Sequence, residues 1–152
     1  MVKYSAALAT LMLVFSLGFS VPPAAAKDAV STGTFSSLAV DGYDVVGYCT
    51  EARPVKGRSR HGIIWNAATW HFASAGNLAR FKADPKAFAP QNGSYCPRAV
   101  AQGNTAPSDP TAWRVVNGKL YPNYNHDIQS RWEKNAQANT TKAAANWPKV
   151  LE

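Results

Sequence analysis

Cysteine is scarce in this chain of 152 residues, in which only Cys49 and Cys96 occur, together with three histidines. The chain has no C-x-x-C pair, and neither cysteine lies at a ligand-like spacing from a histidine. The G-x-S-x-G, H-E-x-x-H, phosphate-loop and dinucleotide-binding motifs are missing as well. The sequence therefore gives no support for a catalytic activity, and we predict that the protein is not an enzyme.

Charged residues are few, at 16% of the chain, and most of them are basic, which gives a formal net charge of +7. The basic residues are spread along the sequence, and the only close group is Lys56, Arg58 and Arg60. This group lies among glycines and serines, so a solvated loop explains it better than a nucleic-acid-binding surface. We therefore expect no nucleic-acid partner.

A long apolar run occurs only near the N-terminus, at residues 6–19. It is shorter than the roughly 20 residues that a membrane-spanning helix needs, and Pro22 follows closely. Lys3 precedes the run and small residues up to Ala26 follow it, which is typical of a cleaved secretory signal peptide rather than an uncleaved anchor. We expect a signal peptide over residues 1–26, cleavage after Ala26, no stable membrane span after cleavage and a periplasmic or secreted protein.

Aromatic residues are plentiful, with five tryptophans, six tyrosines and six phenylalanines. This content favours a folded domain with an aromatic core, and the length suits a single domain. Residues 27–37 are rich in serine, threonine and glycine and show no period. They predict a flexible leader, which places the domain itself at residues 38–150.

Two β-hairpins are predicted. One has its turn at residues 66–68 and carries Trp70 and Phe72 on one face and His71 on the other, and the second turns at Asn117-Gly118. The β-branched and aromatic run at 43–48 predicts a further strand.

Helix signals lie between and after these hairpins. The expected helix starts are Ser74, Ser94, Asn125 or Asp127, and Thr140 or Thr141, and the expected ends include Ala83, Gly103 and Trp147. The fold class that follows is α+β, a small single domain with two β-hairpins packed against several short helices.

Five blocks along the chain have a familiar order. They are DGYDVVGY at 41–48, WNAATWHFAS at 65–74, FKADPKAFAPQNGSYC at 81–96, VVNGKLYPNYN at 115–125 and ANWPK at 145–149. From residue 41 to 149 the chain resembles the YHS-domain family in its bacterial exported form. The resemblance implies a heavy-metal-binding module. However, Ala73 and Asn77 stand where the F-C-S-x-x-C motif of short YHS domains has cysteines, so a thiolate site there is not carried over.

Cys96 is the leading candidate for chemistry. It matches the cysteine of a G-G-Y-C-A-type block in the exported subgroup, with departures at Ser94 and Pro97. A cysteine at a helix start lies near unpaired N–H groups, which favour the thiolate needed for metal binding or attack. A site of Cys96 and His71, with Cys49 or His126, would suit copper(I) or zinc.

Two alternatives for Cys96 remain open. Because an exported protein folds in an oxidising compartment, Cys49 and Cys96 could form a disulfide. Cys96 could also be a free buried thiol on a stripe with Ala99 and Val100.

Several tyrosines predict a pocket with hydroxyl groups for a small ligand. They are Tyr43, Tyr48, Tyr95, Tyr121 and Tyr124. The resulting expectation is an exported YHS-like binding module that binds a transition metal, copper first, through Cys96. The alternatives are a metal-free small-molecule-binding or accessory protein with an aromatic pocket, and a disulfide-stabilised protein-interaction domain whose partner the sequence does not name.

Overall fold

A computed structural model describes residues 26–33 and 35–152. The predicted signal peptide lies outside the described residues, except for Ala26. Over the described part of the chain, no helix combines the length and the apolar character needed to cross a membrane.

The described residues form six α-helices, two two-stranded antiparallel sheets and three short 3-10 turns. Along the chain these are η1 (Val40–Gly42), α1 (Val45–Thr50), β1 (Arg58–Trp65), β2 (Ala68–Phe72), α2 (Ala75–Ala83), α3 (Pro85–Phe88), η2 (Gln91–Ser94), α4 (Pro97–Ala101), β3 (Asp109–Val116), β4 (Lys119–Asn123), α5 (His126–Glu133), α6 (Ala136–Asn146) and η3 (Lys149–Leu151). The predicted small α+β domain with two hairpins and several short helices is confirmed.

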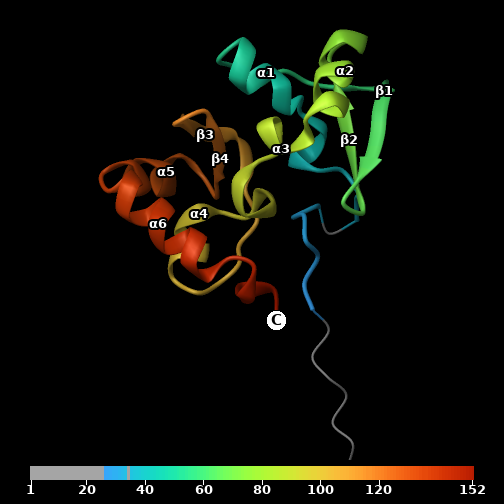
Figure 1. The fold of residues 1–152 in the computed structure, drawn as a ribbon. Helices are drawn as coiled ribbons and strands as arrows, with labels where there is room; N and C mark the ends of the chain where they lie inside the picture. The colour runs from blue at the N-terminus through green and yellow to red at the C-terminus, as the bar shows by residue number, and fades with distance from the viewer. Residues whose placement is uncertain (1–25, 34) are drawn as a thin grey trace, which may run out of the picture.

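The two hairpins lie on opposite sides of the molecule (Figure 1). The β1–β2 hairpin packs against α2, whereas β3–β4 packs against α4 and α5, and α6 lies mainly against α4. Each hairpin closes through two residues with positive φ, Asn66 and Ala67 in the first and Asn117 and Gly118 in the second. Such turns match the twist of the paired strands, which explains why both hairpins form where predicted.

The aromatic core lies between β2 and α2. Trp70 and Phe72 are on the buried face of β2, and both rings contact Phe81 of α2, with centroid distances of 5.3 and 5.0 Å. His71 points to the other, half-buried face. The predicted assignment of these three residues to opposite faces is confirmed.

The strand predicted at 43–48 is wrong, because α1 occupies most of this stretch. The buried carboxylate of Asp44 accepts hydrogen bonds from the N–H groups of Val46 and Gly47, at 2.9 and 3.3 Å. Its other oxygen accepts from the N–H of Ala73 and the side-chain amide of Asn77, at 2.8 and 2.7 Å. These hydrogen bonds cap the N-terminus of α1. The β-branched residues that follow Asp44 favour a strand, and for this reason the sequence pattern did not indicate the helix start.

The segment at residues 27–33 belongs to the folded domain, whereas the sequence suggests a flexible leader there. The N–H of Lys27 donates to the carbonyl of Leu151 at 2.8 Å, and the N–H of Ser31 donates to that of Gly93 at 2.7 Å. These bonds attach the segment to η2 and η3.

Burial of Val30 also holds this segment against the domain, because its side chain is 3% exposed and belongs to the main core cluster. Gly93 allows the close approach, since a Cβ at its positive φ of 57° would overlap with the carbonyl oxygen of Ala29. The ordered domain therefore begins before residue 38.

Two helix starts differ from prediction. Ser94 lies in η2, and Cys96 is the residue that precedes α4. α6 begins at Ala136, ahead of the expected Thr140 or Thr141. Ser74 and Asn125 do cap α2 and α5 through their side-chain oxygens, as predicted.

Candidate functional site

The two cysteines do not meet in this structure. Cys49 lies exposed in α1, Cys96 is 1% exposed before α4, and both thiols are free. The candidate disulfide between them is therefore not formed. Cys49 lies near the end of α1, while Cys96 is buried and lines a small cavity together with Ala99 and Ile128.

The predicted metal ligands are not brought together either. Over residues 26–33 and 35–152, no three His, Cys, Asp or Glu side chains group closely enough to hold a metal ion. The imidazole of His71 lies beside Gly42 and Gly62. Desolvation raises the pKa of the Cys49 thiol, which opposes the thiolate that a metal needs. The described residues therefore do not assemble a three-ligand site from Cys96, His71 and Cys49, and metal binding stays a prediction.

His126, the alternative ligand, lies elsewhere. Its Nε2 is 3.5 Å from Oγ1 of Thr111, which also donates to Asp109 at 2.7 Å. Burial tends to raise the pKa of Asp109, but the two hydrogen bonds from Thr111 and the charge of His126 hold this pKa below its usual value. These three residues form a polar group at the start of β3, without a cysteine.

The tyrosines do not form one pocket. Tyr48 is 2% exposed, donates to the carbonyl of Pro110 at 2.7 Å and packs edge-on against Trp113, so it is a core residue. Burial raises the pKa of its phenol well above the usual value. Tyr121 packs on Trp132, with ring centroids 5.4 Å apart.

Tyr95, Tyr43 and Tyr124 are the more accessible tyrosines. The hydroxyl of Tyr95 donates a hydrogen bond to the backbone carbonyl of Asp28. The polar group of Tyr95 is therefore used to hold the N-terminal segment. Tyr43 and Tyr124 line one open depression together with Asp41 and Lys56. The side chain of Lys56 already covers the ring of Tyr43, at 4.3 Å from its centroid.

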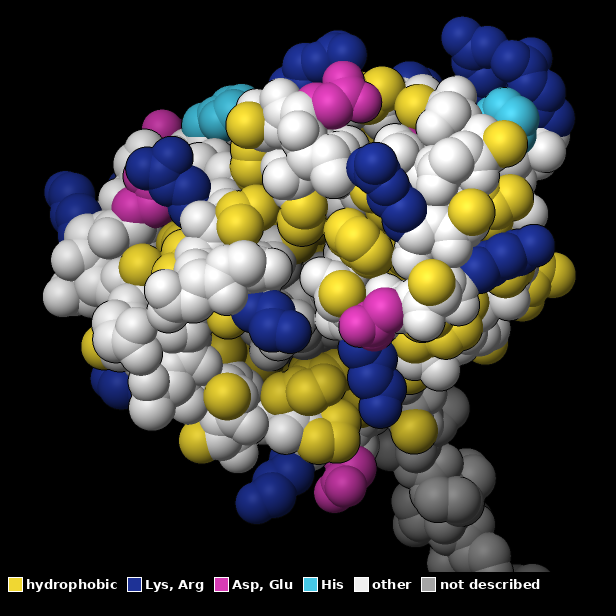
Figure 2. All heavy atoms as spheres, turned by 45° about the horizontal axis from the view of Figure 1, so that its top comes forward, with side chains coloured by type: hydrophobic (Ala, Val, Ile, Leu, Met, Phe, Trp, Pro, Cys, Tyr) yellow, Lys and Arg dark blue, Asp and Glu magenta, His cyan; other side chains and the backbone are white. Residues whose placement is uncertain are grey.

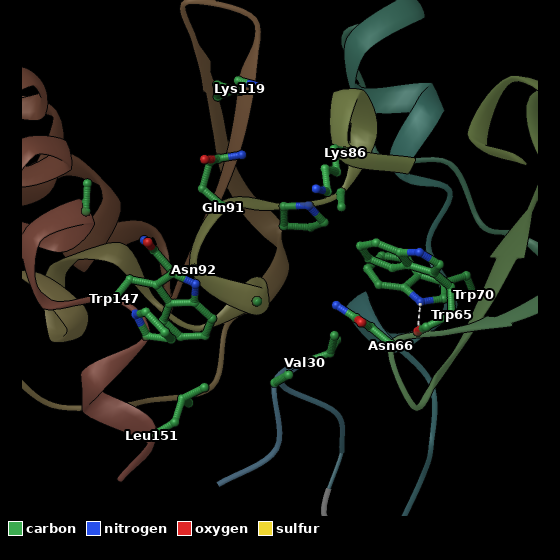
Figure 3. A pocket seen from close by; sticks show the side chains of 16 residues that line it. Val30, Trp65, Asn66, Trp70, Lys86, Gln91, Asn92, Lys119, Trp147 and Leu151 are labelled. Carbon is green, nitrogen blue, oxygen red and sulfur yellow. Dashed lines mark hydrogen bonds between the residues drawn. The ribbon is translucent and has the colours of Figure 1, made fainter. Parts of the chain in front are cut away.

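A different aromatic site exists, and sequence reasoning missed it. We call it the tryptophan groove: Trp65 and Trp70 of the first hairpin and Trp147 after α6 border a cavity of about 540 Å³ (Figure 3). Its other labelled lining residues are Val30, Asn66, Lys86, Gln91, Asn92, Lys119 and Leu151.

Local contacts fix each tryptophan. The indole N–H of Trp70 donates to the carbonyl of Trp65 at 2.9 Å, and the two rings meet edge to face at 5.7 Å. Trp147 ends α6 by donating its N–H to the carbonyl of Ala143, and its ring packs at 6.0 Å from that of Tyr95. The walls of the tryptophan groove are therefore held by the fold without a ligand.

The polar groups of the tryptophan groove are cationic or neutral. Lys86 and Lys119 contribute ammonium groups, and no Asp or Glu lines the cavity. Asn92 is 9% exposed, and its amide nitrogen has no hydrogen-bond partner among the described residues. The site therefore offers positive charge and flat apolar walls.

The chain was also compared with known proteins. No known protein family, curated protein or solved structure matches it. The resemblance to the YHS-domain family stays a prediction, and the tryptophan groove has to be interpreted from its own residues.

Part of the signal for this groove is visible in the sequence. The stretch WNAATW places Trp65 and Trp70 on either side of a predicted turn, and a conspicuous Trp147 follows far along the chain. Nothing in the spacing indicates that Trp147 faces that hairpin. This proximity depends on how α6 packs, which only the tertiary structure decides.

Proposed function

We propose that this protein is an exported binding module that takes a small organic molecule into the tryptophan groove and needs no metal. The observation that carries the proposal is the convergence of Trp65, Trp70 and Trp147 on one cavity of about 540 Å³. Small-molecule sites are typically clefts of about 300–1,000 Å³ with mainly apolar walls and a few polar groups. The tryptophan groove has this size and this composition.

The nature of the walls supports a ligand with a flat apolar part. Indole rings offer a large rigid surface and lose little conformational freedom when a second ring stacks on them. Trp65 and Trp147 are both only half-buried, so their remaining surface is available to a ligand. Asn66, which is exposed, adds an amide group that can orient it.

Copper or zinc binding through Cys96 is the competing proposal, and the resemblance to the YHS-domain family favours it. The 1% exposure of Cys96 and the scattered candidate ligands weigh against it, because metal binding would require rearrangement of the core. A disulfide-stabilised interaction domain is favoured less, since both thiols are free.

Native mass spectrometry tests the proposal. The purified protein is incubated with a small-molecule extract of the cells that produce it, and the retained compounds are weighed. We expect wild type to retain a compound that Trp147→Leu loses. Trp113→Leu is the matched control, because Trp113 packs against Tyr48 and does not line the tryptophan groove.

The same preparations are loaded with copper(I) or zinc, alongside Cys96→Ser. Metal binding that disappears in Cys96→Ser, with no compound dependent on Trp147, would overturn the proposal. Thermal melting of each variant confirms that it is folded.

A further inference from the structure

The chemistry of the tryptophan groove also indicates a ligand class, an inference that rests on the proposed function. Two of its walls face each other: Figure 3 shows Trp147 on one side of the cavity and Trp65 and Trp70 on the other. An aromatic ring packed on either wall would contact indole, and such aromatic contacts stabilise by more than their buried area alone.

One end of the cavity is positively charged. Lys86 of α3 and Lys119 of β4 lie toward the same end in Figure 3, while Val30 and Leu151 lie toward the other. Both lysines are exposed, and neither takes part in an ion pair of the described residues. With no carboxylate in the lining, this end attracts an anion and repels a cation.

We infer that the tryptophan groove binds an aromatic carboxylate. The ring packs on an indole wall of the cavity, and Lys86 and Lys119 balance the charge of the carboxylate. A neutral aromatic compound would use only the walls, and an aromatic cation would be disfavoured by both lysines.

Isothermal titration calorimetry with three probes of the same ring tests this inference. The probes are naphthoate, its neutral counterpart naphthamide, and naphthylmethylammonium. We expect naphthoate to bind about tenfold more tightly than naphthamide, with the cation weakest, because each exposed lysine contributes modestly. The preference for naphthoate should decrease as salt is added.

Variants separate the contribution of the lysines from that of the indole walls. Lys86→Gln with Lys119→Gln should remove the preference for naphthoate, whereas Lys134→Gln with Lys142→Gln, two exposed lysines outside the groove, should keep it. Trp147→Leu should weaken naphthoate and naphthamide alike.

Equal affinity for naphthoate and naphthamide in wild type would overturn the inference and leave the proposed function intact. If none of the three probes binds, the inference is also overturned. The proposed function is then decided separately by the compound retained in native mass spectrometry.

Discussion

At the scale of single residues, the carboxylate of Asp44 holds two helices and a strand end together. It accepts a hydrogen bond from the side-chain amide of Asn77 at 2.7 Å. Asp44 is fully buried and accepts four hydrogen bonds, which join α1 to α2 and to the end of β2. Asn77 is therefore a structural residue in this fold.

Replacing Asp44 by Asn should destabilise the fold by about 3 kcal/mol, because a neutral amide replaces a buried carboxylate and leaves donors without a partner. Urea denaturation measures this loss as a lower midpoint. Asp127→Asn is the control, since Asp127 is exposed and its replacement should change stability by less than about 0.5 kcal/mol. Equal midpoints for the two variants would contradict the structural role of Asp44.

At the scale of the element, side-chain caps decide where helices begin. Ser74 and Asn125 follow simple local rules, and both starts are predictable from the sequence. Asp44 obeys the same rule, but the two valines that follow it, Val45 and Val46, favour a strand. Contacts with Ala73 and Asn77 from the neighbouring elements stabilise the helical alternative, and a local pattern cannot include them.

The start of β3 carries a second such contact, and its stability should depend on pH. The folded pKa of Asp109 lies below its usual value of 3.8, mainly through the hydrogen bonds from Thr111. Its contribution is therefore present above that value and is lost as pH falls through the lower, folded pKa. We expect Asp109→Asn to be less stable than wild type at neutral pH, and this difference to shrink as pH falls below 3.8 and through the folded pKa of Asp109.

Thermal melting over a pH series measures the effect. Thr111→Val, which deletes only the hydroxyl donor, should remove part of the pH dependence. Identical pH profiles for wild type and Asp109→Asn would show that the contact does not stabilise the fold.

At the scale of the whole molecule, the segment at residues 27–33 packs against η2 and η3. Residues 27–33 run from the end of the chain at η3 to η2, and Val30 reaches the core and the wall of the tryptophan groove. Basic side chains are dispersed over the face drawn in Figure 2 and do not form a stripe. The feature that distinguishes this molecule is therefore its aromatic groove rather than a charged surface.

Val30→Ala should lower the free energy of unfolding by about 2 kcal/mol and weaken naphthoate binding, because it leaves a cavity in both the core and the groove wall. Phe35→Ala, in the neighbouring stretch, is the matched control: its side chain is fully exposed, so both properties should stay unchanged. Urea denaturation and calorimetry provide the two readouts. A Val30 variant as stable as the Phe35 variant would mean that the segment does not hold the fold together.

The sequence by itself determined the fold class, the two hairpins, the buried face of β2 and the caps of α2 and α5. These features depend on residues a few positions apart, so their periodicity and turn chemistry can be recognised within a short stretch of sequence. Only the tertiary structure decided that Cys49 and Cys96 stay apart, that the tyrosines are divided among several places, and that Trp147 lies across from Trp65. Such distances depend on how helices and hairpins pack, and burial of apolar surface, which drives that packing, is non-directional and specifies no partner in advance.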